Sequence, residues 1–404
     1  MLGGGIISKS LSIEKEVSTV LSKDNKKYIE LAQNLILLSV FSCFIYFWVA
    51  RALIVVSVLA FFFLPGIGNV VFSRKSSFMM LLFSLVGLAV SLCYRNLYGS
   101  LSYPMLFAIF YFCMVVRAIA TREFFEKILN TMCVGGCVAT GVAIVEKIVN
   151  MPNISLRAQA GFPNPNFLGA ALMTAVMVCV YKVANKAPKT YIYFIFAAIN
   201  AIGILLCGSM SLWVVMAIGA MFLFILNKNT KLLIALVCVI VVVVAALFVV
   251  PHIFTRLDEV SLTTQNRINI WRFAIENIKT APIFGRGFFT YKYLYNQMVA
   301  TRPEIIQVSL AHNLLIDSVL CHGLFGTGII LSYIGIYLKD LISCRKMLKE
   351  KKQSRTLNSF IIAMFVAIVF YGVIDTTFVW VQSGTLLLII ASGLGVDENK
   401  LKNI

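Results

Sequence analysis

The stretch LLIALVCVIVVVVAALFVV, residues 232–250, decides the fold class of this chain. All 19 of its residues are apolar, and a run of about 20 apolar residues can cross the hydrocarbon core of a bilayer as an α-helix. Similar runs recur along the 404 residues, of which 60% are hydrophobic and 13% are charged. Ordinary soluble domains carry about 25% charged residues. The composition therefore excludes a soluble enzyme, a disordered chain and a disulfide scaffold, and it predicts an all-α polytopic membrane protein.

Hydropathy predicts about 12 transmembrane helices within a single integral membrane domain, residues 1–404. The joint between the first two spans is expected at Ala50 and Arg51, and the joint between the seventh and eighth at residues 208–210. The predicted spans cover residues 31–50, 52–72, 77–94, 101–119, 128–147, 166–184, 190–208, 210–227, 231–251, 314–339, 357–376 and 380–396.

The distribution of Lys and Arg predicts that both termini are cytoplasmic. With this orientation, 24 of the 35 basic residues lie on the cytoplasmic side and 11 lie outside, which is the asymmetry that membrane proteins show. Residues 1–30 and 397–404 then form cytoplasmic tails, and the first span is expected to act as an uncleaved signal. Because the membrane accounts for the net charge of +18, no nucleic-acid partner is expected.

One extracytoplasmic loop, residues 252–311, is too long to be a plain connector, and loops of this length are usually functional. A helix is predicted over residues 266–280, ended by Pro282. An apolar stripe with Trp and Arg is typical of a helix in the membrane interface, and packing of the same helix on the bundle is an equal alternative. The stripe consists of Ile268, Trp271, Ile275 and Ile278.

Familiar motifs of soluble enzymes are missing from the sequence, which contains no GxGxxG, P-loop, HExxH or GxSxG. Three histidines are too few for a multi-histidine metal site. The ten cysteines lie mainly within apolar runs, where they are interpreted as packing residues. We therefore expect no metal and no cofactor, and a substrate that arrives already activated.

His312 is the first candidate for catalysis. It lies in SLAHNLLID, where the long loop enters the tenth span. A cap by Ser309 would place His312 in the first turn of that helix, where the helix dipole favours the neutral imidazole. A neutral imidazole at the mouth of a membrane cavity can accept a proton from a hydroxyl group. The alternative is an ordinary interfacial histidine.

Three arginines of the long loop, Arg267, Arg272 and Arg286, are candidates for binding an anion. Guanidinium groups are always charged and bind phosphate oxygens with two parallel hydrogen bonds. Because Arg267 and Arg272 are five residues apart on the predicted helix, only one of them is expected to point inward. The alternative is a set of charges facing solvent or lipid headgroups.

A second anion site is predicted in the stretch LRAQAGFPNPNFLGA, residues 156–170. Asn166 is expected to cap the following helix, and Arg157 lies nine residues before it. A capped helix N-terminus beside an arginine is a ready site for an anion. A rigid turn with a cap is the alternative interpretation.

Three acidic residues, Glu146, Asp317 and Asp375, lie toward the outer ends of predicted spans. Ionisable residues within the membrane are costly and are usually functional. One of these carboxylates is expected to orient His312, and the sequence does not choose between them.

Four motifs between Arg267 and Gly326 together resemble the O-antigen ligase and O-antigen polymerase family of bacterial membrane glycosyltransferases. They read RINIWRFA, PIFGRGF, AHNLLID and GLFG, and GFPNPNFLGA upstream is similar to a further loop of the family. The resemblance covers about 80 residues, and the remainder agrees only in topology. One position departs from the family pattern, since CGSMSLW carries Met210 where many members have an arginine. Arg157 or Arg286 is expected to compensate.

The resemblance implies a helical bundle of the C class of glycosyltransferases in the bacterial cytoplasmic membrane, with the active site facing outside. It implies a glycan on undecaprenyl pyrophosphate as donor, a glycan or lipid as acceptor, and a flippase and a chain-length regulator as partners beside membrane lipids. The implied roles are general base for His312, pyrophosphate binding for Arg267 and Arg157, weaker substrate contacts for Arg272, Arg286, Asn166 and Asn313, and orientation of the histidine for Asp317 or Asp375.

The function expected from this resemblance is a polysaccharide polymerase that joins lipid-linked repeat units. The close alternative is a ligase that transfers the glycan to a lipid, wall or protein acceptor, because both enzymes use the same donor. A transporter or flippase is a different class that also suits twelve spans, and a membrane scaffold is a third.

Overall fold

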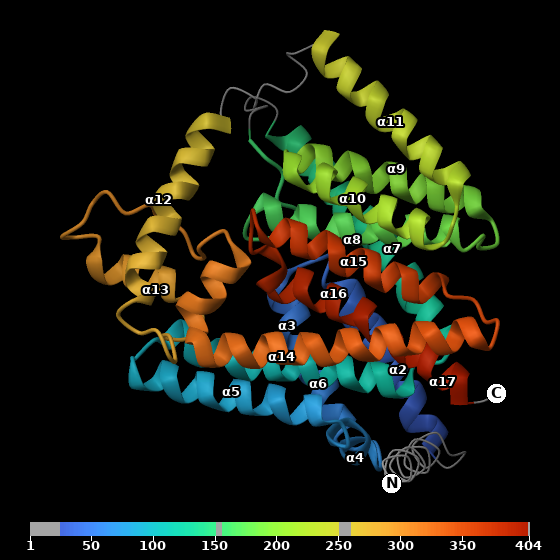
Figure 1. The fold of residues 1–404 in the computed structure, drawn as a ribbon, viewed down its shortest axis with the longest axis horizontal. Coiled ribbons are helices and arrows are strands. Elements are labelled where there is room, and N and C mark those ends of the chain that lie inside the picture. The colour runs from blue at the N-terminus through green and yellow to red at the C-terminus, as the bar shows by residue number, and fades with distance from the viewer. Residues whose placement is uncertain (1–24, 151–155, 250–259, 403–404) are drawn as a thin grey trace.

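The computed structural model describes residues 25–150, 156–249 and 260–402. In these residues the chain is helical throughout its regular structure, without a β-strand. Figure 1 shows the helices gathered in one bundle, with the α12–α13 segment at one end. The order is α2 (Lys26–Ser42), α3 (Phe47–Phe61), α4 (Ile67–Phe72), α5 (Lys75–Cys93), α6 (Leu97–Ile119), α7 (Arg122–Val149), α8 (Pro165–Ala184), α9 (Thr190–Cys207), α10 (Met210–Leu226), α11 (Thr230–Val249), α12 (Val260–Ile278), α13 (Thr290–Met298), α14 (Leu314–Glu350), α15 (Thr356–Gly372), η3 (Thr377–Val379), α16 (Val381–Ser392) and α17 (Leu394–Lys402).

Each of the predicted spans overlaps a helix, so the polytopic all-α fold class is confirmed. Among the described residues, six helices are long and apolar enough to cross a membrane, namely α5, α6, α7, α8, α9 and α14. Shorter apolar helices are α3, α10, the start of α11 and α15. The predicted joint at residues 208–210 is also confirmed, because α9 ends at Cys207 and α10 begins at Met210.

The prediction for the first joint is wrong. Ala50 and Arg51 lie inside α3, and the break falls earlier, at residues 43–46. The guanidinium of Arg51 packs over the rings of Phe47 and Trp48, at 5.1 and 5.3 Å from their centroids. Such cation–π contacts stabilise a charge within an otherwise apolar helix, so this arginine does not mark a turn.

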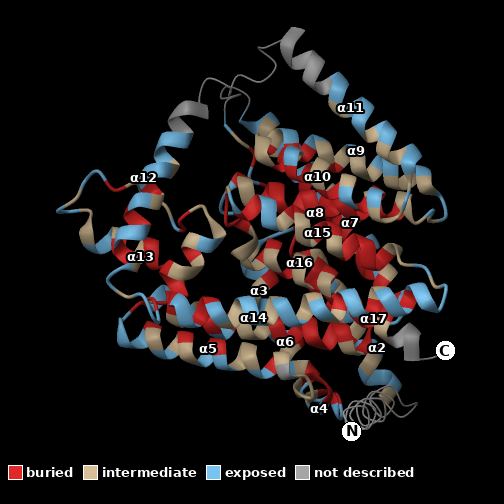
Figure 2. Cartoon of the chain, viewed as in Figure 1, coloured by how far each residue is buried: buried red, intermediate tan, exposed pale blue. Residues whose placement is uncertain are grey.

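The bundle is organised around α8, which packs against α7, α9, α10, α15 and α16. In its most apolar window, 78% of α8 is buried, against 22% of α9. Figure 2 shows the same division, with buried residues concentrated toward the middle of the bundle and exposed ones along α5, α9 and α11. The exposed faces are rich in large apolar side chains, as a surface against lipid requires.

The long helix α14 is interrupted at Gly323, whose backbone has φ 62° and ψ −174°. A break inside a membrane helix leaves polar backbone groups that must find partners within the protein. Here the partners come from PIFGRGF, residues 282–288, which follows α12. The joining hydrogen bonds run from Leu324 N to Pro282 O, from Phe325 N to Ile283 O, and from Arg286 N and Gly287 N to Cys321 O.

The helix predicted over residues 266–280 is confirmed as α12, although it begins earlier and ends at Ile278, ahead of Pro282. In Figure 1 this helix runs across the direction of α14 at the end of the bundle. The second helix of the segment, α13, is not predicted by the sequence pattern. The predicted stripe is divided, since Trp271 and Ile278 pack into a small core with α13 and α14 whereas Ile268 and Ile275 are exposed.

The predicted tails lie partly outside the described residues. The structure does not describe residues 1–24 of the first tail or residues 403 and 404 of the second. It also does not describe residues 252–259 of the long loop. The described portion of the second predicted tail, residues 397–402, belongs to helix α17, which follows α16 and begins at Leu394.

Candidate functional site

His312 lies just before α14, and its backbone is left-handed with φ 51°. The prediction that Ser309 caps this helix is wrong, because the cap is Asn313. The Asn313 side chain accepts hydrogen bonds from the backbone N–H groups of Leu315 and Ile316, at 3.1 and 3.0 Å. His312 is therefore not in the first helical turn, and the helix-dipole argument for its neutral form does not apply.

The backbone around His312 is held in place on both sides. Asn313 Nδ2 donates to the carbonyl oxygen of Val373 at 3.1 Å, and the Asp317 carboxylate accepts from the backbone N–H of Ala311 at 2.8 Å. A left-handed residue other than glycine costs about 1–3 kcal/mol, and such residues cluster at functional sites. These two bonds maintain that conformation and direct the imidazole toward α15.

The imidazole of His312 is hydrogen-bonded to Asp375, with 3.0 Å between Nδ1 and Oδ1. Asp375 follows α15 and is 3% exposed, while the His312 side chain is 28% exposed. An ionised carboxylate can only accept, so Nδ1 carries a proton in this bond and Nε2 of the neutral ring is an acceptor. No described residue forms a hydrogen bond with Nε2. Of the three carboxylates that the sequence left open, Asp375 is the one that forms a hydrogen bond with His312.

The other oxygen of Asp375 connects the histidine to the loop before α8. The prediction that Asn166 caps α8 is wrong, because Asn164 is the cap and Pro165 occupies the first helical position, as prolines often do. This frees the Asn166 amide, whose Nδ2 donates to Asp375 Oδ2 at 3.0 Å. Asn166 Oδ1 in turn accepts a hydrogen bond from the guanidinium of Arg157. The four side chains form a continuous chain of hydrogen bonds.

Arg157 also reaches the joint between α9 and α10, where its Nε donates to the carbonyl oxygen of Cys207 at 2.6 Å. Its guanidinium thus contacts the end of α9, three residues before Met210 in the chain. The loop that carries Arg157 is anchored by Glu146, which accepts from the backbone N–H groups of Gln159 and Ala160 at 2.9 and 2.6 Å. Glu146 is therefore committed to the loop and does not contact His312.

The two arginines of α12 point in different directions, in agreement with their helical spacing. Arg267 is half-buried, and its positive charge acts on Asp375 and on the hydroxyl of Tyr371. Arg272 is exposed. Only Arg267 of this pair thus contributes positive potential to the histidine site.

Arg286 is not part of the group around His312. Its guanidinium donates to the carbonyl oxygen of Asn277 at 3.2 Å and to the hydroxyl of Thr280 at 2.5 Å, and it lies 5.6 Å from the ring centroid of Tyr94. These contacts close the turn after α12. Of the two arginines expected to compensate for Met210, Arg157 contacts the joint that precedes Met210, whereas Arg286 contacts the turn after α12.

Several buried polar side chains in the ten residues after Asp375 are not identified by sequence reasoning, because isolated threonines and glutamines carry no motif. Buried polar atoms are almost always paired in folded proteins. Trp380, at the edge of this group, stacks on Phe167 with 4.7 Å between ring centroids. Within the described part of the chain, atoms without a hydrogen-bond partner include Thr376 Oγ1, Trp380 Nε1, Gln382 Oε1 and Thr385 Oγ1.

The described residues contain no group of three or more His, Cys, Asp or Glu side chains that could hold a metal ion.

A family model described as O-antigen ligase matches residues 194–331. Residues 194–331 are thus similar to the O-antigen ligase family. The match confirms the resemblance read from the motifs, and it runs from α9 into α14, so it includes Arg267 and His312. Arg157, Asn166 and Asp375 lie outside the matched residues. The packing of the helices brings them next to His312. No curated protein matches the chain.

The match and the apolar helices together support a bacterial membrane protein of the glycosyltransferase type. The matched segment supplies the histidine and one arginine. Asn166 of α8 and Asp375, in the connection after α15, supply the amide and the carboxylate of the hydrogen-bond chain that ends at the histidine.

Proposed function

We propose that this protein transfers a glycan from a lipid-linked pyrophosphate donor to an acceptor hydroxyl at the outer face of the bacterial cytoplasmic membrane. The observation that carries the proposal is the hydrogen bond between His312 Nδ1 and Asp375. It leaves Nε2 as the proton acceptor on a side chain that is 28% exposed, as a general base requires.

In the proposed reaction, Nε2 of His312 accepts the proton of the acceptor hydroxyl, and the oxygen attacks the anomeric carbon of the donor. The bond between that carbon and the pyrophosphate oxygen breaks, and its electron pair leaves with the lipid pyrophosphate. Attack opposite the leaving group inverts the configuration of the sugar. The Asp375 carboxylate stabilises the imidazolium that forms.

The leaving group is stabilised in this proposal by Arg267 and Arg157. Positively charged groups placed where negative charge develops are commonly the largest contribution to catalysis. Arg267 lies on the α12 side of Asp375, and Arg157 is linked to the same carboxylate through Asn166. A pyrophosphate between them would lie next to the reacting carbon.

Two acceptor classes are compatible with this site. Polymerisation, in which the acceptor is another lipid-linked glycan, is our first proposal, with a donor carried on undecaprenyl pyrophosphate. Transfer to a lipid, wall or protein acceptor is the second, and it is favoured by the description of the matching family model as an O-antigen ligase.

A glycan analysis in a strain that lacks the gene tests the proposal. The strain is complemented with wild type, with His312→Ala and with Arg267→Ala, and Arg272→Ala serves as the matched control on the exposed face of α12. At equal membrane levels, we expect the wild type and Arg272→Ala to restore a ladder of long glycans. The other two variants should leave single repeat units.

If the null strain accumulates full-length polymer on the carrier lipid, polymerisation does not need this protein. The protein would then be assigned as a ligase and not as a polymerase. Normal glycan with His312→Ala would remove His312 as the base. Normal glycan in the null strain itself would contradict a role in glycan transfer altogether.

A further inference from the structure

A cavity lies in the half of the bundle farthest from His312. It has a volume of about 200 Å³ and opens between α6, α14, α15 and α16. Because α6 and α16 both end there, at Ile119 and Ser392, the cavity faces the membrane leaflet on the α17 side. Its walls are mainly apolar and include Phe110, Met114, Ile334, Met364, Phe365 and Leu388.

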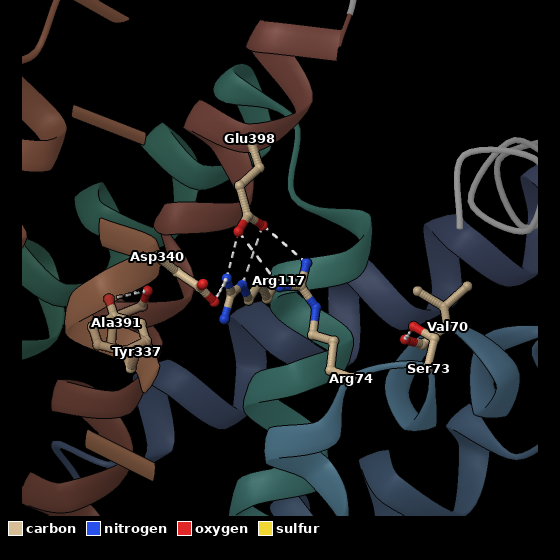
Figure 3. A network of polar contacts seen from close by, with 8 residues as sticks. All are labelled: Val70, Ser73, Arg74, Arg117, Tyr337, Asp340, Ala391 and Glu398. Atoms are coloured by element: carbon tan, nitrogen blue, oxygen red, sulfur yellow. Dashed lines mark hydrogen bonds and ion pairs between the residues drawn. The ribbon is translucent and has the colours of Figure 1, made fainter. Parts of the chain in front are cut away.

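One end of this cavity is charged. Figure 3 shows the ionic network there, in which the arginines Arg74 and Arg117 converge on Glu398. Arg117, which lines the cavity, is paired with Glu398 of α17 at 2.5 Å and lies 3.8 Å from Asp340 of α14. Arg74 pairs with the other oxygen of Glu398 at 2.9 Å. Asp340 is the most exposed of these four side chains, at 43%. Next to it in the chain is Lys339, which is exposed.

Two tyrosines of α14 line the cavity and differ in their hydrogen bonds. The Tyr337 hydroxyl donates to the carbonyl oxygen of Ala391 at 2.8 Å. The Tyr333 hydroxyl has no hydrogen bond within the described residues, although its ring packs edge-on against Phe110. A polar donor in an apolar wall gains free energy when a ligand supplies an acceptor.

We propose that this cavity binds one acyl chain of a phosphatidylethanolamine molecule from the leaflet on the α17 side. At this depth a bilayer offers hydrocarbon chains, which match the apolar walls. An ester carbonyl at the head of the chain accepts the hydrogen bond from Tyr333. The headgroup then lies at the charged end, with its ammonium at Asp340 and its phosphate at Lys339, so the adjacent opposite charges fit a zwitterionic headgroup.

Native mass spectrometry of the full chain, purified in mild detergent and supplied with dioleoyl phosphatidylethanolamine, tests this proposal. We expect one retained phosphatidylethanolamine per wild-type chain. Two variants that fill the cavity from different helices, Met364→Trp and Ala391→Leu, should reduce this retention at least about tenfold. Phe370→Trp is the matched control, because Phe370 lies on the exposed face of the same α15 and is 49% exposed.

Two further measurements separate a structural effect from lipid binding. Tyr333→Phe keeps the shape of the cavity and should lower retention about fivefold, the size expected for one hydrogen bond. Asp340→Asn should bring the retention of phosphatidylethanolamine down to that of dioleoyl phosphatidylglycerol. If a filled variant does not fold, these two conservative variants still decide the question.

Equal retention by wild type and both filled variants would overturn the proposal, as would equal retention of the two lipids by wild type. A lipid-free dimer that Ala391→Leu converts to a monomer would assign the cavity to a second copy of the chain instead.

Discussion

The carboxylate of Asp375 fixes which nitrogen of His312 is available for a proton. An asparagine at this position can present its amide N–H to Nδ1, which would place the ring proton on Nε2. We expect Asp375→Asn to reduce the rate of glycan transfer about 10²- to 10⁴-fold, the range attributed to general acid–base catalysis. The rate is measured in proteoliposomes with a lipid-linked donor.

Asp340→Asn is a suitable control for that experiment, because Asp340 lies at the other end of α14. It should leave the transfer rate unchanged. A transfer rate for Asp375→Asn within about threefold of wild type would show that the orientation of His312 does not depend on this bond.

The two asparagines before and within α8 have separate tasks, which can be distinguished by mutation. Asn166→Ala breaks the link between Asp375 and Arg157, and we expect it to slow transfer about tenfold or more, since hydrogen bonds to charged groups contribute about 1.5–3 kcal/mol. Asn164→Ala removes the helix cap and should lower the free energy of unfolding by about 1 kcal/mol with little effect on rate. The two effects are read from transfer assays and thermal unfolding, and exchanged results would reverse the assignment.

At the level of the helices, the break in α14 depends on glycine. A Cβ at Gly323 would lie 2.3 Å from the carbonyl oxygen of Ile283, on a backbone with positive φ. Gly323→Ala should therefore clearly lower the melting temperature. The backbone strain costs about 1–3 kcal/mol, and each lost backbone hydrogen bond costs about 1 kcal/mol more. The matched control on the same helix is Gly328→Ala.

Apart from its chain neighbours and the backbone of its own helix, no described atom lies within 4 Å of a Cβ at Gly328. Alanine is favoured over glycine within a helix by about 0.5–1 kcal/mol, so this control should raise the melting temperature slightly. Equal melting temperatures of the two variants would contradict the account of the break.

The helices themselves could be predicted from hydropathy, while their ends depended on side-chain contacts that the pattern does not contain. The first joint was misplaced because Arg51 is accommodated by the rings of its own helix. The cap of α8 could have been found, since an asparagine followed by proline is a common helix start. The break at Gly323 could not, because its partners lie about 40 residues away in the chain.

At the level of the whole molecule, α17 is held to the bundle by the carboxylate of Glu398. Burial raises the pKa of this carboxyl group, but Arg117 and Arg74 outweigh that effect and lower it to about 2, from its usual 4.5. A lowered pKa means that the stabilisation is complete above about pH 4.5 and is lost as the pH falls toward 2. Glu398→Gln should therefore reduce the melting temperature at pH 7.

The difference in melting temperature between wild type and Glu398→Gln should narrow as the pH is lowered below about 4.5. Thermal unfolding in detergent between pH 7 and pH 3 measures it, with Glu276→Gln as an exposed control. A difference that stays constant over this range would show that Glu398 does not act through its charge.

The sequence could indicate single candidate residues of the site, but it could not show which of them contact one another. His312 and Arg267 stood out by their residue type and their place in a long loop. Their partner Asp375 comes from the connection after α15, and Asn166 from the start of α8, so only the packing of these helices could select them. An arginine that stood out equally, Arg286, proved to close a turn, because side-chain type alone does not show which backbone groups are near.

The interruption of α14 also bears on the order in which the chain is assembled. Residues 282–288 are translated before Gly323, so the carbonyl groups that receive the amides of Leu324 and Phe325 already exist when the second half of α14 emerges from the ribosome. A version of the chain permuted to begin at residue 314 would make the helix first and its partners last. In such a chain the amides of Leu324 and Phe325 would enter the membrane before their hydrogen-bond acceptors had been synthesised. In the natural order the acceptors come first.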